Sequence, residues 1–195
     1  MDNEMTLIAK LGFHHLDHAP NVETVDLSKF RTIDKTIWQQ LGSCNWLTLC
    51  QNALVLGPHG IGKTYLSAAL CTRALQSGYS VRRSTLSNLQ RVLATQNNNS
   101  DRQQLLDVGL FTNLLIVDDF LPGLLLDPDE AAQVWAFLAG RQSHDSVMLI
   151  TSLPIHCWRL VDNPLVVSYV NSILLNAIVL EIKEKLCLRP IRRSD

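Results

Sequence analysis

The 195-residue chain is poor in charged and aromatic side chains, and neither sign of charge is in excess. Charged residues make up 18% of the sequence, and 17 Lys and Arg stand against 18 Asp and Glu. Many domains that bind nucleic acid are strongly basic, so any contact with DNA must be local. A charge content below the usual ~25% is also consistent with a surface that is shared with other subunits or a partner.

Closely spaced cysteine pairs and long apolar runs are both absent. No C-x-x-C pair occurs among the five cysteines, which are Cys44, Cys50, Cys71, Cys157 and Cys187. An odd number at wide spacing favours a reduced, cytoplasmic setting. The N-terminus has no apolar signal segment, and no apolar run approaches the roughly 20 residues that a membrane span needs. We therefore expect a soluble cytoplasmic protein.

The most informative motif is the octapeptide at residues 57–64, which matches G-x-x-x-x-G-K-[ST]. It follows a strand-like apolar run at 53–56 and precedes an Ala/Leu-rich helical run at 65–76. Glycines let successive backbone N–H groups turn inward, and the following helix directs its positive dipole end at the same point. The sequence therefore predicts a phosphate-binding loop rather than a turn that only links strand to helix. The predicted binding residues are Gly57, Pro58, His59, Gly60, Ile61, Gly62, Lys63, Thr64 and Tyr65.

The loop chemistry points to a nucleoside triphosphate, with ATP and Mg²⁺ as the expected ligands. Lys63 would reach the β- and γ-phosphates as a mobile positive charge, which makes it a catalytic candidate as well as a binding one. The Thr64 hydroxyl would help to hold Mg²⁺, which keeps most of its own waters.

A second motif completes the expected nucleotide site. Residues 114–119 read L-L-I-V-D-D, four apolar residues followed by two carboxylates at the end of a predicted strand. Ligands of open α/β sheets bind at that end, and the pattern is that of a Walker B motif. Asp118 is predicted to hold the metal shell, and Asp119 to act as general base for the attacking water. A solvated turn is the alternative.

A third polar element follows the apolar run at 148–150. Thr151 and Ser152 end this predicted strand, at the place where some P-loop ATPases carry a polar sensor of water and γ-phosphate. The alternative is that these hydroxyls cap a short helix at 155–160.

Strand and helix patterns alternate from residue 53 onward, which predicts a parallel sheet. Strands are expected at 53–56, 79–83, 114–117, 147–150 and 178–182. Helices are expected at 34–41, 65–76, 85–94, 128–138 and 165–176; Ser84 is expected to introduce the third and Asp127 to cap the fourth. We divide the chain into an N-terminal lead-in arm at 1–50 and an ATP-binding domain at 51–195.

Several stretches together resemble a known family. They are Asn45-Trp46-Leu47, the loop with its strand at 52–64, Leu89-Gln90-Arg91, residues 114–119, Leu153-Pro154 and Trp158. In these the chain resembles the IstB-like ATPases, transposition helpers of the AAA+ superfamily related to DnaC-type helicase loaders. The resemblance implies a P-loop NTPase fold, a three-layer α/β sandwich with a parallel five-stranded sheet in the order 5-1-4-3-2. It also implies an ATP-dependent homo-oligomer on DNA, with a transposase or a replicative helicase as partner.

The chain departs from that family at three positions that bear on hydrolysis. Asp119 stands where the family has glutamate, and Ser152 replaces a sensor asparagine. Ser172 aligns with an arginine that reaches a neighbouring subunit's nucleotide, and such an arginine is typically worth about 10³–10⁵ in rate. Arg159 or Arg141 could substitute. We therefore expect a weak ATPase.

Three functions remain open: a transposition helper, a helicase loader, and a nucleotide-binding structural subunit with little or no hydrolysis. DNA contacts are expected from Arg82 and Arg83 and from the basic tail. The tail candidates are Arg189, Arg192 and Arg193. A group at His14, His15 and His18 reads as solvated histidines rather than a metal site, and the four tryptophans read as core anchors rather than base-stacking platforms.

Overall fold

The computed structural model describes residues 20–30, 32–94, 112–121, 127–141, 143–158 and 162–183. Several features predicted from the sequence lie outside these ranges. They are the histidine group at 14–18, Arg159, Cys187 and the basic tail with Arg189, Arg192 and Arg193.

Five parallel strands form the centre of the molecule. They are β1 (Asn52–Leu56), β2 (Val81–Thr85), β3 (Leu114–Asp118), β4 (Ser146–Thr151) and β5 (Ala177–Glu181). Their order in the sheet is β2-β3-β4-β1-β5, which confirms the predicted 5-1-4-3-2 arrangement. The strands β1, β3 and β4 are buried along their whole length, as expected for parallel strands covered on both faces.

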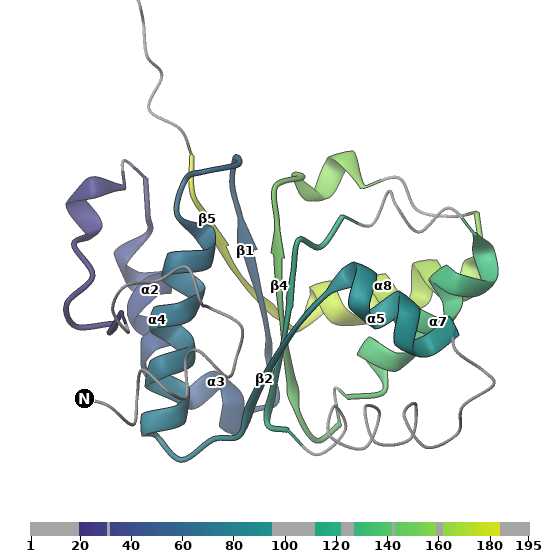
Figure 1. The fold of residues 1–195 in the computed structure, drawn as a ribbon, viewed down its shortest axis with the longest axis horizontal. Coiled ribbons are helices and arrows are strands. Elements are labelled where there is room, and N and C mark those ends of the chain that lie inside the picture. Colours follow the sequence, from purple (N-terminus) through teal and green to yellow (C-terminus); the bar gives the residue numbers. More distant parts are fainter. Residues whose placement is uncertain are drawn as a thin grey trace, which may run out of the picture.

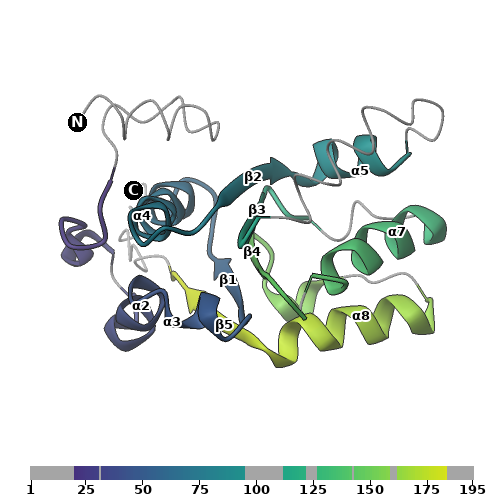
Figure 2. The same cartoon turned by 90° about the horizontal axis from the view of Figure 1, so that it is seen from below.

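Helices cover both faces of this sheet and make three layers (Figures 1 and 2). On one face lie α2 (Lys35–Gly42), α3 (Asn45–Thr48) and α4 (Lys63–Gln76). On the other lie α5 (Leu86–Ala94), α7 (Pro128–Ala139) and α8 (Pro164–Leu175). The connecting segments that the structure describes include two short 3₁₀ helices, η1 (Leu27–Lys29) and η3 (Ile155–Cys157). In the ranges that the structure describes, no helix is long and apolar enough to cross a membrane.

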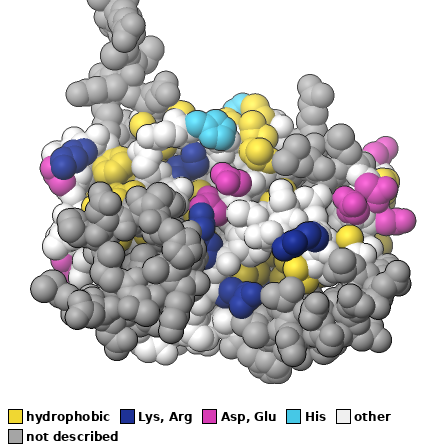
Figure 3. Space-filling view, in the orientation of Figure 1, with side chains coloured by type: hydrophobic (Ala, Val, Ile, Leu, Met, Phe, Trp, Pro, Cys, Tyr) yellow, Lys and Arg dark blue, Asp and Glu magenta, His cyan; other side chains and the backbone are white. Residues whose placement is uncertain are grey.

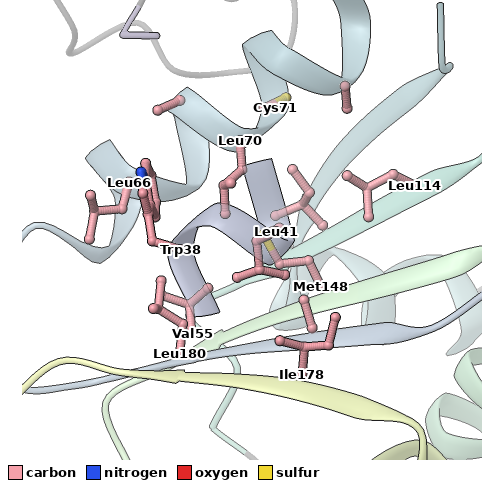
Figure 4. Packing of buried hydrophobic residues seen from close by; sticks show 14 of the residues in the cluster. Trp38, Leu41, Val55, Leu66, Leu70, Cys71, Leu114, Met148, Ile178 and Leu180 are labelled. Atoms are coloured by element: carbon pink, nitrogen blue, oxygen red, sulfur yellow. The ribbon is translucent and has the colours of Figure 1, made fainter. Parts of the chain in front are cut away.

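Each face of the sheet has its own hydrophobic core. Alternate strand residues supply the two cores: Val55 and Ile116 face α4, whereas Leu54 and Leu115 face α7 and α8. Figure 4 shows the first core, where Leu66 and Leu70 of α4 point toward the sheet. All four tryptophans are buried, which confirms that they are core anchors.

The described part of the lead-in arm belongs to the first core. Trp38 and Leu41 of α2 pack in the cluster that contains the α4 residues (Figure 4). Trp46 of α3 belongs to the same cluster. Asp34 caps α2, because its carboxylate accepts hydrogen bonds from the N–H groups of Thr36 and Ile37. The division at residue 50 stays a prediction.

The helices and strands begin and end close to the predicted residues, with two corrections. Asp127 caps α7 with Pro128 in its first turn, as predicted. The second strand spans Val81–Thr85 rather than 79–83. The introduction of α5 by Ser84 is wrong, because the Thr85 hydroxyl, not that of Ser84, accepts the Asn88 N–H at the start of this helix.

Candidate functional site

The predicted phosphate-binding loop joins the end of β1 to the start of α4, inside the fold that the motif requires. Gly60 and Gly62 have φ angles of 74° and 99°, a region that other residues rarely adopt. A Cβ on Gly57 would lie 2.6 Å from the Ile182 carbonyl oxygen, and one on Gly62 would lie 2.7 Å from Phe30 Cε1. The glycines are therefore needed both for the turn and for the close approach of Ile182, directly after β5, and of Phe30 in the lead-in arm.

The N-terminus of α4 has no side-chain cap. Its N-cap residue is Gly62, which makes no side-chain cap hydrogen bond. An uncapped N-terminus beside a glycine-rich loop leaves N–H groups that suit an anion. The structure thus offers a cradle that fits the phosphates of a nucleotide.

Lys63 lies at the centre of this cradle. Its Nζ donates a hydrogen bond to the Pro58 carbonyl oxygen at 2.8 Å, so the loop's own backbone holds the ammonium group. Burial lowers the pKa of Lys63 below its ordinary value, and the charges of Asp118 and Asp119 oppose that shift. The sheet topology agrees with this, because the loop follows β1 and the carboxylates end β3, and both strands run parallel to β4 between them.

The other predicted loop residues differ in exposure. His59 and Tyr65 are exposed, and Thr64 is half-buried. Ile61 packs against the first core and so anchors the loop to the domain. Figure 3 shows acidic and basic side chains side by side near the middle of the molecular face that it draws.

Asp118 and Asp119 have different environments although they are adjacent. Asp118 is 3% exposed, and its Oδ1 accepts the Asp119 N–H at 2.9 Å. Asp119 is exposed, with a φ of 50°, so the chain turns sharply directly after β3. A buried carboxylate is costly unless a cation or donor meets it, whereas an exposed one can reach a ligand freely. This contrast agrees with separate roles for the two carboxylates.

Strand β4 lies between β3 and β1, so its end lies between the two motifs. Thr151 is 1% exposed, and its Oγ1 accepts the Leu153 N–H at 3.1 Å. Ser152 is half-buried. The alternative that these hydroxyls cap the following helix is wrong, because η3 begins after Pro154 with no side-chain cap. A sensor role for Ser152 stays a prediction.

Sequence reasoning missed the residue that pairs with Asp118. Arg83 Nη2 donates to Asp118 Oδ2 at 2.7 Å, and the two side chains are only 15% and 5% exposed. Arg83 was predicted to contact DNA, but its described partner is this carboxylate. The strand order could have indicated the pair, because β2 lies next to β3 and Arg83 shares a face with Ile116 and Asp118.

Arg141 does not belong to the site. Its side chain is 0% exposed and donates to the Thr112 carbonyl oxygen at 2.6 Å. Asp145, 3.9 Å from Arg141, lies just before β4 begins, whereas the phosphate-binding loop follows the end of β1. Arg141 is therefore at the opposite edge of the sheet from this chain's own loop. Its fully buried guanidinium contradicts the prediction that it reaches a neighbouring subunit's nucleotide in place of the missing arginine.

The donor set fits Mg²⁺ and a nucleotide better than a transition metal. Nowhere in the described ranges do three or more His, Cys, Asp or Glu side chains gather in a metal-binding group. A hydroxyl from Thr64 and a carboxylate from Asp118 are hard oxygen ligands, and Mg²⁺ is commonly held by few protein oxygens together with phosphates and water.

The sheet order, the glycine loop and the carboxylates define a P-loop nucleotide-binding domain. The chain belongs to the family described as IstB-like ATP binding protein, which matches residues 3–192.

Curated relatives agree with this assignment. The chain is 28% identical over 170 residues to an insertion sequence ATP-binding protein of Sinorhizobium fredii, and 25% identical over 170 residues to the IS5376 ATP-binding protein of Geobacillus stearothermophilus. In both cases the match covers 86% of this chain and 67% of the relative. The chain thus spans about two thirds of the length of these relatives.

Solved structures show the same fold at low sequence identity. DnaI matches with a TM-score of 0.61 and 18% identity over 85% of this chain and 89% of DnaI. The replication initiator DnaA bound to AMPPCP and single-stranded DNA matches with a TM-score of 0.63 and 16% identity, over 85% of this chain and 50% of that chain. These likenesses establish the fold.

Proposed function

We propose that this chain binds ATP with Mg²⁺ and hydrolyses it slowly as an accessory ATPase of DNA transposition. The observation that carries the proposal is the sheet topology: the loop with Lys63 follows β1 and the carboxylates Asp118 and Asp119 end β3, and both parallel strands flank β4, so the two motifs lie at the same edge of the sheet. A P-loop lysine and hydroxyl facing the carboxylates of a buried strand form the arrangement that binds and cleaves nucleoside triphosphates.

The described side chains suit separate tasks in this reaction. Lys63 exchanges its bond to the Pro58 carbonyl oxygen for bonds to the β- and γ-phosphates, which are stronger because both partners are charged. Thr64 and Asp118 would hold the metal, which would supply positive charge to neutralise the phosphate oxygens. Asp119, exposed at the end of β3, accepts the proton of the attacking water as ADP and phosphate form.

The biological setting is proposed from the relatives. The curated relatives named above are ATP-binding proteins of insertion sequences, which favours a transposase as partner over a replicative helicase. Assembly into a homo-oligomer on DNA is part of the same proposal. Arg82 on the edge strand β2 and the basic tail are the candidate phosphate contacts.

A nucleotide-binding subunit with little or no hydrolysis is the second candidate function. It rests on Ser172, which stands at the position of the family arginine and whose hydroxyl donates to the Tyr169 carbonyl oxygen within α8. A hydroxyl used in this way provides no positive charge for a neighbouring nucleotide.

Calorimetric titration with ATP and Mg²⁺, combined with phosphate release, tests the proposal and separates the two candidates. Asp119→Asn should keep nucleotide binding yet lower turnover on the order of 10²-fold or more, as expected for loss of a general base. The matched control is Asp129→Asn, an exposed carboxylate in the first turn of α7. Absence of ATP binding in the wild type would refute the proposal, whereas binding without turnover would favour the structural subunit.

Assembly and partner choice need separate measurements. Sedimentation with ATP and DNA reports assembly, and Ser172→Arg asks whether a restored guanidinium raises turnover in the assembled state. Pull-down with purified transposase and with purified replicative helicase distinguishes the helper from the loader. Strong DNA-stimulated hydrolysis by the wild type would show that another arginine acts in trans.

A further inference from the structure

Arg83 and Asp118 form a buried ion pair. Through this pair β2, which carries neither of the two nucleotide-binding motifs, contacts the predicted metal site. Arg83 Nη2 lies 2.7 Å from Asp118 Oδ2, while Asp118 Oδ1 accepts the Asp119 N–H. Both oxygens of the carboxylate therefore already have a donor. A charge-assisted hydrogen bond of this length between side chains that are 15% and 5% exposed is stronger than a surface ion pair.

The register of the sheet places the two groups together. Arg83 on β2 is paired with Ile116 on β3, and Asp118 follows Ile116 by two residues on the same face. Ile116 lies in the core beside α4, so Arg83 also points toward that helix. Arg82 is paired with Leu115, which lies in the opposite core, so the two neighbouring arginines point to opposite faces.

We propose that Arg83 is a positioning residue that holds Asp118 in the metal-free protein and competes with Mg²⁺ for it. This inference rests on the proposed function, because it assumes that Asp118 serves the metal of a bound nucleotide. A buried carboxylate needs a compensating cation. Arg83 is that cation before the nucleotide arrives, and it shares or yields Asp118 when Mg²⁺ binds.

If Arg83 and Mg²⁺ compete for Asp118, loss of Arg83 should lower the stability of the metal-free protein but raise the affinity for Mg²⁺. Removing the guanidinium leaves Asp118 without its ion-pair partner, so the metal-free protein should be less stable. The same change removes a positive charge next to the metal position, so Mg²⁺ should bind more tightly. A residue with a merely structural role would produce the first effect and not the second.

The test compares Arg83→Met with Arg82→Met, the adjacent arginine on the other face. A fluorescent ATP analogue at fixed concentration is titrated with MgCl₂ to give the half-saturating Mg²⁺ concentration. Thermal unfolding is measured in EDTA without nucleotide. Arg83→Met should lower the half-saturating concentration about tenfold, within the usual range of coupling between two sites. It should also lower the melting temperature in EDTA. Arg82→Met should change neither value, because both measurements are made without DNA, the only ligand proposed for Arg82.

Arg83→Lys provides a second test if Arg83→Met does not fold. Lysine keeps the positive charge but lacks the planar fork, so its hold on the carboxylate is weaker. We expect a decrease in half-saturating Mg²⁺ of roughly two- to threefold, in the same direction.

Three outcomes would overturn the inference. Equal Mg²⁺ dependence of the Arg83 and Arg82 variants would show that the pair does not affect the metal. Weaker binding of the analogue to Arg83→Met in EDTA would mean that Arg83 contacts the phosphates directly. Failure of the wild type to bind the analogue at any Mg²⁺ concentration would instead remove the proposed function, and this inference with it.

Discussion

Lys63→Ala should abolish tight binding of ATP. In the structure the ammonium group donates a hydrogen bond to the Pro58 carbonyl oxygen at 2.8 Å, so it lies against the loop that is predicted to bind the phosphates. A hydrogen bond to a charged group contributes about 1.5–3 kcal/mol, so loss of two such bonds to the β- and γ-phosphates costs about 3–6 kcal/mol. The dissociation constant should therefore rise by roughly 10²–10⁴-fold.

Calorimetric titration with ATP in the presence of Mg²⁺ measures this effect, with Lys35→Ala at the exposed start of α2 as the control. Because burial lowers the pKa of Lys63 and phosphate binding needs its charged form, wild-type affinity should fall as pH rises through that lowered pKa. Melting curves of the two variants would confirm that both are folded. Equal ATP affinity in the wild type and a folded Lys63→Ala variant would refute the assignment of the loop.

Three further predictions follow from buried groups and from the loop glycines. Arg141→Ala should lower the free energy of unfolding by about 2–4 kcal/mol, because packing and hydrogen bonds are lost. Turnover per folded molecule should stay unchanged, because Arg141 lies at the edge of the sheet opposite the nucleotide site. Reduced turnover in folded protein would contradict this placement. Gly62→Ala should lower the free energy of unfolding by about 1–3 kcal/mol and weaken ATP binding. The reason is that a φ of 99° is strained for alanine and that the new Cβ would lie 2.7 Å from Phe30 Cε1. An unchanged melting temperature and ATP affinity would argue against the close approach of Phe30 to the loop. Brief alkylation at pH 8 followed by mass spectrometry should modify the exposed Cys157 before Cys71, because burial raises the pKa of Cys71 to about 12; equal labelling would mean that α4 opens readily.

Local sequence motifs predicted much of the fold and of the candidate site. The glycine loop, the apolar runs and the capping residues Asp34 and Asp127 predicted where strands and helices begin, since these signals depend on neighbours a few residues apart. The loop ligands Lys63 and Thr64 were readable for the same reason. The order of the strands came from the family resemblance, because periodicity alone does not say which parallel strands are neighbours.

The sequence by itself therefore determined the P-loop domain, its predicted phosphate-binding residues and the two carboxylates after β3. Only the tertiary structure decided the partners of those groups. Arg83 and its partner Asp118 are 35 residues apart, and Arg141 and its partner Thr112 are 29 residues apart. No local pattern therefore indicated that Arg83 faces the site or that Arg141 is buried far from it. Such pairs depend on which strands become neighbours and in what register, because the register determines which face of the sheet each side chain occupies.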